Sequence, residues 1–304
     1  MIRSSSNLSS QSPWLEIAEQ ICSSLNTHFV LEKINAVGGG CINETYHIQG
    51  NEQHYFVKLN KASNLPMFEA EAAGLKEIQN SHTLRVPEPK CWGRNDFSAW
   101  LVLEYLDLRH TPNQHAEALG TGLASMHRTF SDQFGWFRNN TIGSTLQKND
   151  RSSDWIHFWR HNRLGYQLQL AQINDYKGKL QTQGERLIAD LDVFFTGSRI
   201  NACLLHGDLW SGNYSFDSTG QPVLFDPAVY YGDREADLAM TELFGGFPPQ
   251  FYASYQDAYP LEVGYRTRKT LYNLYHVLNH LNLFGSGYLR QAEQMMDRLL
   301  AEIR

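Results

Sequence analysis

The sequence lacks the features of several protein classes: excess positive charge, long apolar runs and a dense set of cysteines. Its 304 residues carry a formal net charge of −6 and contain no basic run or basic–aromatic interleaving, so a nucleic-acid surface is not expected. No stretch approaches ~18 apolar residues, and residues 1–12 are Ser-rich and polar, without the apolar centre of a signal peptide. We therefore expect a cytoplasmic protein with no membrane partner.

Cysteine is too sparse for a disulfide framework or a zinc site. The four thiols, Cys22, Cys41, Cys91 and Cys203, have no metal-ligand spacing. We expect three of them to pack in the core, whereas Cys41 follows three glycines, where backbone amides and bound cations favour a thiolate. Cys41 is therefore a candidate redox switch whose oxidation would give a disulfide-linked dimer. The alternative is an inert small residue in a monomer.

The second half of the sequence contains a phosphotransfer pattern. The stretch His206-Gly207-Asp208-Leu209-Trp210-Ser211-Gly212-Asn213 follows one apolar run, and Asp226 ends the next. A carboxylate, an amide five residues later and a second carboxylate after a short hairpin is the spacing of kinase-type phosphoryl transfer, which depends on positioning and charge stabilisation. We expect Asp208 to accept the proton of the acceptor hydroxyl, and Asn213 and Asp226 to bind Mg²⁺. The alternative, ordinary turn carboxylates, requires the whole set to recur by chance.

The first half carries the pattern of a nucleotide-binding sheet. A strand-like segment at 29–37 is interrupted by Gly38, Gly39 and Gly40 and then resumes, which gives a glycine-rich hairpin whose backbone amides can approach phosphates. One lysine is embedded in the next apolar strand, and burying its ammonium is costly unless an anion pairs with it. Lys58 is therefore the expected ligand of the α- and β-phosphates of ATP.

Two further elements complete the expected ATP site. The next helix carries Glu71 beside its apolar stripe, and a helix carboxylate in kinase-like sites pairs with the strand lysine and orients it. The alternatives are Glu69 as the partner or a solvated Glu71. A later buried strand leads into a hinge, where backbone groups of Glu104 and Leu106 are expected to pair with adenine.

The spacing of these elements predicts an α+β, bilobal protein. The N-lobe, residues 1–106, is expected to contain a leading helix at 14–25 and a mainly antiparallel sheet with one inserted helix. The C-lobe, residues 107–304, is expected to be mostly helical, with a two-stranded catalytic hairpin and with ATP in the cleft. Length alone also predicts about two domains. The helical patterns of the C-lobe lie near 113–129, 154–172, 184–196, 267–284 and 289–303.

With both halves in place, the chain resembles the fructosamine kinase (ketosamine-3-kinase) family, a relative of the aminoglycoside and choline kinases within the protein-kinase-like fold. The matching stretches are GGGCINETY (38–46), FVKLN (56–60), FEAEAAGL (68–75), FGWFRNNTIGSTLQKND (134–150), HGDLWSGN (206–213) and LFDPAVYYGDREADLAMTELFGGFP (224–248). The resemblance implies ATP-dependent phosphorylation of the C3 hydroxyl of a ketosamine, after which the adduct decomposes and frees the amine. It leaves the sugar open among ribulosamines, erythrulosamines and fructosamines.

The resemblance also implies roles for residues outside the phosphotransfer spacing. In similar kinases an Asp at the position of Asp237, on a helix expected over 234–244, bonds the backbone of the catalytic loop; the alternative for Asp233 or Asp237 is favourable charge near a helix N-terminus. His206 is expected to buttress that loop, because no paired nucleophile accompanies it. Only ten residues separate Asp226 from Asp237, too few for a peptide-docking segment, so a small sugar adduct, free or on a protein side chain, is the expected acceptor.

The acceptor site is expected near the catalytic carboxylate, walled by Trp210 and by elements from 134–165. Aromatic residues are dense in that segment and either stack on sugar C–H surfaces or, at helical spacing, belong to the core. They are Phe134, Trp136, Phe137, Trp155, Phe158 and Trp159. Asn139, Gln147 and Arg163 are candidates for bonding hydroxyl groups.

Two other functions stay open. Another small-molecule kinase, of the aminoglycoside or choline type, would favour an acidic patch for a cationic acceptor, and the segment 134–165 shows no concentration of acids. A nucleotide-binding pseudokinase that acts as a scaffold would need a missing catalytic group. All the groups expected for catalysis are present: Lys58, Asp208, Asn213 and Asp226.

Overall fold

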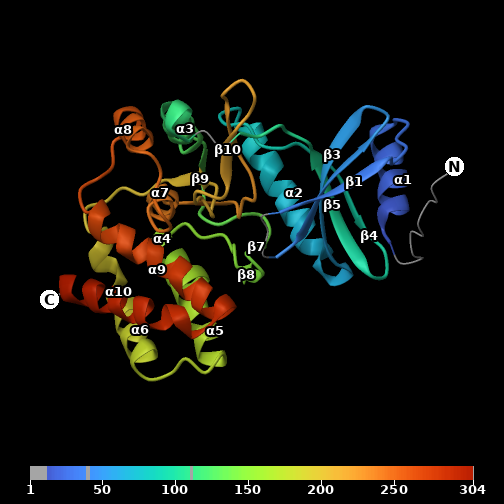
Figure 1. The fold of residues 1–304 in the computed structure, drawn as a ribbon. Helices are drawn as coiled ribbons and strands as arrows, with labels where there is room; N and C mark the ends of the chain where they lie inside the picture. Colours follow the sequence, from blue (N-terminus) through green and yellow to red (C-terminus); the bar gives the residue numbers. More distant parts are fainter. Residues whose placement is uncertain (1–11, 39–41, 110–111, 304) are drawn as a thin grey trace. The chain divides into compact units, whose positions relative to one another are not determined.

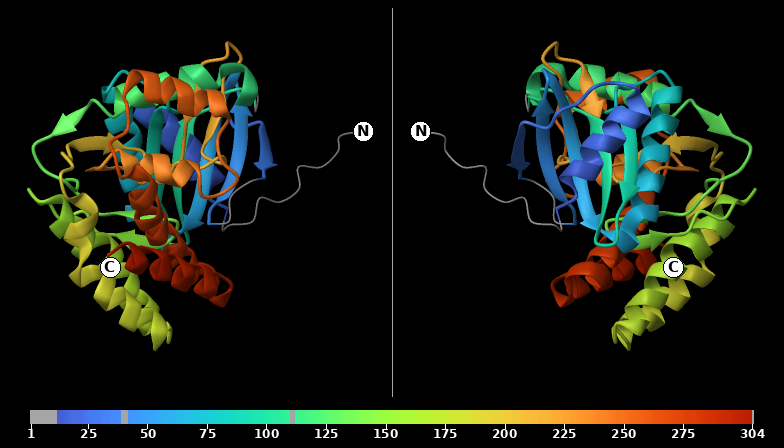
Figure 2. Two further views of the ribbon diagram at one scale, coloured as in Figure 1. Left: turned by 90° about the vertical axis from the view of Figure 1, so that its left-hand side faces the viewer. Right: turned by 90° about the vertical axis from the view of Figure 1, so that its right-hand side faces the viewer.

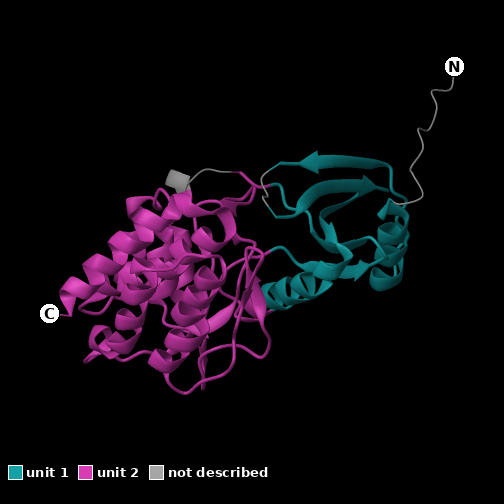
Figure 3. Cartoon of the chain, turned by 90° about the horizontal axis from the view of Figure 1, so that it is seen from below, with its two compact units in different colours: residues 1–76, 87–107 teal, residues 77–86, 108–304 magenta. Residues whose placement is uncertain are grey.

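The computed structural model describes residues 12–38, 42–109 and 112–303. The chain divides into two compact units, drawn in teal and magenta in Figure 3. Unit 1 comprises residues 1–76 and 87–107, and unit 2 comprises residues 77–86 and 108–304. The third passage of the chain between the units, after residue 107, lies one residue from the lobe boundary expected after Leu106.

Unit 1 is built on a five-stranded antiparallel sheet with the order β1-β2-β3-β5-β4. Its strands are β1 (Lys33–Val37), β2 (Glu44–Gly50), β3 (Gln53–Lys61), β4 (Pro89–Arg94) and β5 (Ser98–Glu104). The two residues that join β2 to β3, Asn51 and Glu52, both have positive φ (48° and 64°), which is the backbone of a tight two-residue hairpin turn. This turn fixes the register that places Lys58 opposite Thr45.

Two helices cover the sheet of unit 1 on opposite faces (Figure 1). α1 (Trp14–Leu25) packs an apolar stripe against one face, and the leading helix expected at 14–25 is thereby confirmed. The core on this face consists of Trp14, Ile17, Ile21, Phe29, Ile48, Tyr55, Val57, Leu59, Cys91, Trp100 and Val102. α2 (Leu65–Asn80) follows a 3₁₀ turn (Ala62–Asn64) and buries Phe68, Ala72, Leu75 and Ile78.

Unit 2 is mostly helical. Its helices are α3 (Pro112–Met126), α4 (Trp155–Phe158), α5 (Gly165–Ile173), α6 (Lys179–Ala189), α7 (Glu235–Thr241), α8 (Pro249–Ala258), α9 (Tyr265–Phe284) and α10 (Leu289–Glu302), with 3₁₀ turns at Leu191–Phe195 and Ser286–Tyr288. Figure 2 shows α10, in red, beside the yellow-green α5 and α6, and α10 contacts both α6 and α9. The other main pairs are α3 with α8 and α7 with α9.

Short antiparallel strands position the loops of unit 2. β9 (Ala202–Leu205) pairs with β12 (Tyr230–Gly232) and with β6 (Phe130–Ser131). β10 (Tyr214–Phe216) and β11 (Pro222–Leu224) form the two-stranded hairpin expected from the sequence, and β7 (Asn140–Ile142) forms another with β8 (Thr145–Gln147). The stretch 206–213 therefore joins β9 to β10, and Asp226 lies just beyond β11.

Several element boundaries differ from the expected ones. The strand expected over 29–37 begins only at Lys33, where pairing with β2 starts, whereas the Phe29 N–H donates to Cys22 Sγ and its ring packs in the core. α6 begins at Lys179, five residues before the expected start, and the end of that pattern is 3₁₀ rather than α-helical. The helix expected near 154–172 is interrupted by a π-helical turn, Trp159–Leu164. The helix expected over 234–244 is limited to α7.

The cysteines of the described residues are free thiols: Cys22, Cys91 and Cys203. Burial raises the pKa of both the Cys91 and the Cys203 thiol to about 12, and Cys22 packs against the core of unit 1. The expectation that three cysteines pack in the core is confirmed, whereas Cys41 lies outside the described residues. In the part of the chain that the structure describes, no helix combines the length and the apolar character needed to cross a membrane.

Candidate active site

The loop between β9 and β10 holds the expected base and amide close together. The Nδ2 atom of Asn213 donates to the backbone carbonyl of Asp208 at 2.8 Å and lies 3.4 Å from the Asp208 carboxylate. These bonds turn the Oδ1 atom of Asn213 away from that carbonyl. The Phe225 N–H donates to the Asn213 carbonyl at 3.1 Å, so the loop is tied to the residue that precedes Asp226.

Two unusual backbone conformations allow the loop and the Asp226 segment to approach this closely. Gly207 has φ +82°, and a Cβ at this position would lie 2.1 Å from the carbonyl oxygen of Ala228. Only glycine fits there. Asp226 has φ +58°, a left-handed conformation that is uncommon outside glycine, although Asp and Asn adopt it more readily than other residues, and such positions concentrate at functional sites.

The His206 side chain links the catalytic loop to the segment that contains Asp226. Its Nε2 donates to the Phe225 carbonyl at 3.0 Å, and its Nδ1 accepts from the Asp208 N–H at 3.3 Å, so the bonds fit the neutral Nε2-protonated tautomer. Burial lowers the pKa of His206, which keeps the ring neutral. The Ala228 N–H also donates to the His206 carbonyl at 2.8 Å. This geometry supports the buttressing role expected for His206.

Asp237, on α7, accepts hydrogen bonds from the backbone at the start of the loop. Its carboxylate binds the His206 N–H at 2.7 Å and the Gly207 N–H at 2.8 Å. Burial alone would raise the pKa of Asp237, but hydrogen bonds from His127 and the backbone hold it below its ordinary value. His127 is itself buried, has a lowered pKa, and lies 3.2 Å from Asp237 through Nε2 and 2.8 Å from the Tyr255 hydroxyl through Nδ1.

We expect Asp237→Asn to lower the free energy of unfolding by roughly 1–3 kcal/mol, because the amide keeps one of the two acceptor oxygens and leaves one buried N–H group without a partner. We also expect kcat to fall by about 10–100-fold, because the loop that carries Asp208 is no longer fixed. Urea unfolding and steady-state kinetics measure the two effects. Tyr255→Phe removes a hydroxyl from the far side of His127 and is the control, expected to destabilise the protein without changing kcat. If Asp237→Asn, like the control, kept the wild-type kcat, the role of Asp237 would be limited to folding.

Asp208 is poised to exchange a proton near neutral pH. Burial and the neighbouring carboxylates of Asp226 and Asp237 raise its pKa to about 7, although part of the side chain still reaches solvent. A bound cation at Asn213 and Asp226 would favour the ionised form, since opposite charge lowers a carboxyl pKa. The arrangement therefore suits a base that must be ionised to accept a hydroxyl proton and that is protonated afterwards.

Unit 1 contains the expected lysine–glutamate pair. The Nζ of Lys58, on β3, lies 2.5 Å from Oε1 of Glu71 on α2, and both side chains are almost completely buried. In this ion pair, the partner of Lys58 is Glu71 rather than Glu69. The carboxylate orients the ammonium, as expected of a strand lysine in a kinase-like site.

The glycine-rich hairpin is described only up to Gly38, which is exposed; Gly39, Gly40 and Cys41 lie outside the described residues. The ends of this hairpin next to the sheet are held by two side chains that the sequence analysis did not identify. Thr45 Oγ1 donates to the Val37 carbonyl at 2.6 Å, and Asn60 Nδ2 donates to the Ile42 carbonyl at 3.1 Å. The sequence could have indicated this role for Asn60, because Asn60 follows Lys58 by two residues and therefore lies on the same face of β3.

The expected hinge lies at the end of β5. The backbone N–H of Glu104 donates to the Glu88 carbonyl at 2.9 Å, so pairing of Glu104 with adenine would use its carbonyl oxygen. Leu106 follows outside the strand. The adenine contacts of Glu104 and Leu106 stay a prediction.

The acceptor-site expectations are partly wrong. Gln147 and Arg163 are 1% and 0% exposed and hydrogen-bond within the protein, so neither reaches an acceptor. Asn139 uses its Oδ1 to bind the Asn149 N–H. Trp210 is 38% exposed and its ring lies over Gly212, which leaves it as the aromatic candidate on the loop itself. Of the aromatic residues at 134–159, all but Phe137 are buried core residues: Phe134, Trp136, Trp155, Phe158 and Trp159.

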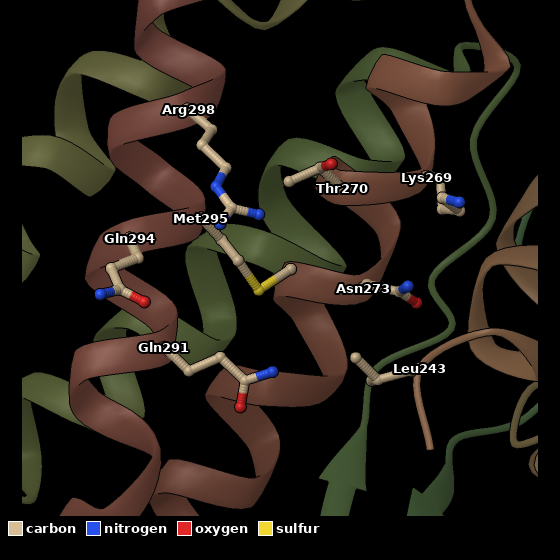
Figure 4. Close-up of a pocket in the computed structure, with 8 residues that line it drawn as sticks. All are labelled: Leu243, Lys269, Thr270, Asn273, Gln291, Gln294, Met295 and Arg298. Carbon is tan, nitrogen blue, oxygen red and sulfur yellow. The ribbon is translucent and has the colours of Figure 1, made fainter. Parts of the chain in front are cut away.

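A cavity of about 300 Å³ lies elsewhere in unit 2, between α9 and α10 (Figure 4). Its lining comes from these two helices and from Leu243, and none of it belongs to the stretch 206–237. The lining residues are Leu243, Lys269, Thr270, Asn273, Gln291, Gln294, Met295 and Arg298. This cavity is therefore separate from the loop that carries Asp208.

Comparison with known proteins places this site in a family context. Residues 13–302 match the model of the fructosamine kinase family. The "Probable ketoamine kinase" of Synechocystis sp. is 45% identical over 294 residues, which cover 96% of this chain and 99% of that protein. The chloroplastic protein-ribulosamine 3-kinase of Arabidopsis thaliana is 43% identical over 277 residues, covering 90% of this chain and 84% of that protein.

Solved structures agree with the fold. A crystal structure assigned as a fructosamine-3-kinase from Haemophilus somnus superposes with a TM-score of 0.87 at 27% identity, covering 94% of this chain and 97% of that one. A choline kinase from Streptococcus pneumoniae superposes with a TM-score of 0.61 at 15% identity, covering 96% of this chain and 100% of that one. The α+β kinase-like fold expected from the sequence, with an antiparallel-sheet first part and a helical second part, is confirmed.

Proposed function

Because this chain belongs to the fructosamine kinase family, we propose that it transfers the γ-phosphoryl group of ATP to the C3 hydroxyl of a ketosamine, a sugar joined to an amine by glycation. The protein is an ATP-dependent phosphotransferase with an alcohol acceptor. The observation that carries the proposal is the loop 206–213, in which Asp208 and Asn213 share a hydrogen bond and are tied by backbone bonds to the segment of Asp226. This is the arrangement that phosphoryl transfer to a hydroxyl requires.

Asn213 and Asp226 are the residues that would hold Mg²⁺. An amide oxygen and a carboxylate are oxygen donors of the kind that this ion prefers, and Mg²⁺ commonly takes one or two protein ligands with phosphates and waters. Within the described ranges, no cluster of three or more His, Cys, Asp or Glu side chains is arranged for a metal. When bound with ATP, the ion supplies positive charge against the phosphate oxygens.

The chain's own groups then act on the two substrates. Lys58, oriented by Glu71, would neutralise the α- and β-phosphates, and backbone amides of the glycine-rich hairpin would approach the phosphate oxygens. Asp208 would accept the proton of the C3 hydroxyl. At the same time the C3 hydroxyl oxygen would form a bond to the γ-phosphorus, and the bond between that phosphorus and the leaving ADP oxygen would break. His206 and Asp237 hold Asp208 in place and do not take part in the proton transfer.

A ketosamine acceptor is consistent with the short connection after Asp226. Ten residues separate Asp226 from Asp237, and both β12 and the start of α7 lie among them, so no long segment is available for docking a peptide. We propose free ketosamines and glycated protein side chains as acceptors, with Trp210 stacking on the sugar. Phosphate is a better leaving group than hydroxide, so the adduct can lose phosphate from C3 by elimination, and water would then hydrolyse the resulting imine and release the amine.

We further propose a cytoplasmic site of action. The free thiols of the described residues, with no disulfide among them, are consistent with a reducing compartment.

The proposal is tested by coupled ATP turnover with the purified protein and a panel of acceptors: ribulosyl-lysine, erythrulosyl-lysine, fructosyl-lysine, choline and kanamycin. We expect turnover on at least one ketosamine, its loss in Asp208→Ala, and none on choline or kanamycin. Phosphorus NMR of the product locates the phosphate. Turnover restricted to choline or kanamycin would indicate another small-molecule kinase, and tight ATP binding without turnover on any acceptor would indicate a scaffold.

A further inference from the structure

Two buried amide side chains hold the backbone immediately after Asp226. Asn140 Nδ2 donates to the Val229 carbonyl at 2.8 Å, and Gln147 Nε2 donates to the Ala228 carbonyl at 2.9 Å. They come from β7 and β8, a hairpin far from Asp226 in sequence, and are 5% and 1% exposed. Two successive carbonyl groups of the Asp226 segment are thus fixed by one hairpin.

The two amides are themselves held in a single orientation. Asn140 Oδ1 accepts from Gln147 Nε2 and from Asn149 Nδ2, both at 2.9 Å, and Gln147 Oε1 accepts from the Tyr275 hydroxyl at 2.9 Å. Both amide groups therefore use their oxygen as acceptor and their nitrogen as donor. A flipped amide would place an N–H against a donor and an oxygen against a carbonyl, which is unfavourable in a buried site.

A buried cation completes the cluster. The Arg163 side chain, in the π-helical turn, is fully buried; its Nη2 donates to Asn149 Oδ1 at 2.8 Å and its Nη1 to the Lys148 carbonyl at 2.5 Å. Its guanidinium also lies 4.0 Å from the ring centroid of Tyr230, the first residue of β12. Burying a charge is costly. Here the buried guanidinium contacts both the hairpin of Asn140 and Gln147 and the strand that follows the Asp226 segment.

The Asp226 segment is consequently fixed from two sides. On the side of the catalytic loop, the Ala228 N–H binds the His206 carbonyl, and the Phe225 N–H binds the Asn213 carbonyl. On the other side, the Ala228 carbonyl binds Gln147. Asp226 lies between these hydrogen bonds with φ +58°, and the bonds on both sides hold its backbone in that conformation.

We propose that Gln147 and Asn140 are positioning residues that set the direction of the Asp226 carboxylate toward Mg²⁺, by holding the Ala228 and Val229 carbonyls. The inference rests on the proposed function, because it takes Asp226 as the metal ligand. It gives the segment 134–150 a role in phosphoryl transfer through the metal, in place of the acceptor contact that its sequence suggested.

Gln147→Met tests the proposal, because it keeps the length of the side chain and removes both donated hydrogen bonds. Tyr275→Phe is the matched control, since it removes the hydrogen bond at the other end of the same amide and leaves the Ala228 carbonyl partnered. Calorimetric titration of a non-hydrolysable ATP analogue at increasing Mg²⁺ is the readout, with thermal unfolding in parallel. We expect both variants to lose thermal stability, and Gln147→Met alone to need about 10–100-fold more Mg²⁺ for analogue binding.

Kinetics give a second readout. Saturating Mg²⁺ should restore most of the kcat of Gln147→Met, because the carboxylate is misdirected and not absent. If Gln147→Met fails to fold, Asn140→Ala, which frees the Val229 carbonyl, is expected to show the same shift in Mg²⁺ requirement. A wild-type Mg²⁺ requirement in the variant that folds, beside lowered thermal stability, would overturn the proposal. Analogue binding needs no acceptor, so this result is independent of whether the wild type phosphorylates ketosamines.

Discussion

Replacing Asp208 by Ala is expected to lower kcat by roughly 10²–10⁴-fold while leaving the affinity for ATP close to that of the wild type. Asp208 is the carboxylate on the loop 206–213, and its pKa of about 7 suits proton acceptance from a hydroxyl. The hydrogen bond from Asn213 reaches mainly its backbone carbonyl, which Ala also provides, so the loop should keep its path. Steady-state kinetics on the preferred ketosamine and nucleotide titration measure the two quantities.

Asp217→Asn is the matched control for that experiment. Asp217 lies in the turn between β10 and β11, where its carboxylate binds Arg85 and the turn residue Thr219. Its loss should cost stability without lowering kcat. A near-normal kcat in Asp208→Ala would refute the assignment of Asp208 as the base, and an equal loss in both variants would attribute the effect to damage of the hairpin.

Replacing Asp226 is expected to weaken Mg²⁺-dependent nucleotide binding by more than about 100-fold, because loss of an outer-shell partner alone typically costs 10–100-fold in metal affinity. Asp226→Asn is the informative variant, because Asn tolerates the positive φ of this position and removes only the charge. Asp226→Ala adds backbone strain and is expected to lose stability as well. Calorimetric titration with ATP, in Mg²⁺ and in EDTA, measures the metal-dependent part.

In EDTA, Asp226→Asn should bind ATP at least as tightly as the wild type, since it removes a negative charge that would repel the phosphates when no metal lies between them. The weaker binding of the variant should appear only as Mg²⁺ is restored. If Mg²⁺ raised the ATP affinity of Asp226→Asn as much as that of the wild type, Asp226 would be excluded as a metal ligand, and another oxygen donor would have to bind the ion. A loss of binding that persists in EDTA would show that the variant disturbs more than the metal.

The sequence determined the main elements of the fold and the positions of the chemical groups. Local patterns are sufficient for this: an apolar stripe predicts α1, a lysine inside an apolar strand marks Lys58, and the spacing from Asp208 to Asn213 and Asp226 is set within one hairpin. Each of these depends on neighbours within about 20 residues of the chain. The family motifs lie in the same short segments, which is why the sequence alone reveals them.

Only the tertiary structure decided the roles of the buried polar residues. Gln147 and Arg163 were expected to bind the acceptor because polar side chains in an aromatic-rich segment are equally consistent with a sugar site, yet both are buried and bonded within the protein. The Ala228 carbonyl, which Gln147 binds, lies 81 residues away in sequence. A hydrogen-bonding side chain shows its type in the sequence but not its partner, because burial and long-range packing select the partner.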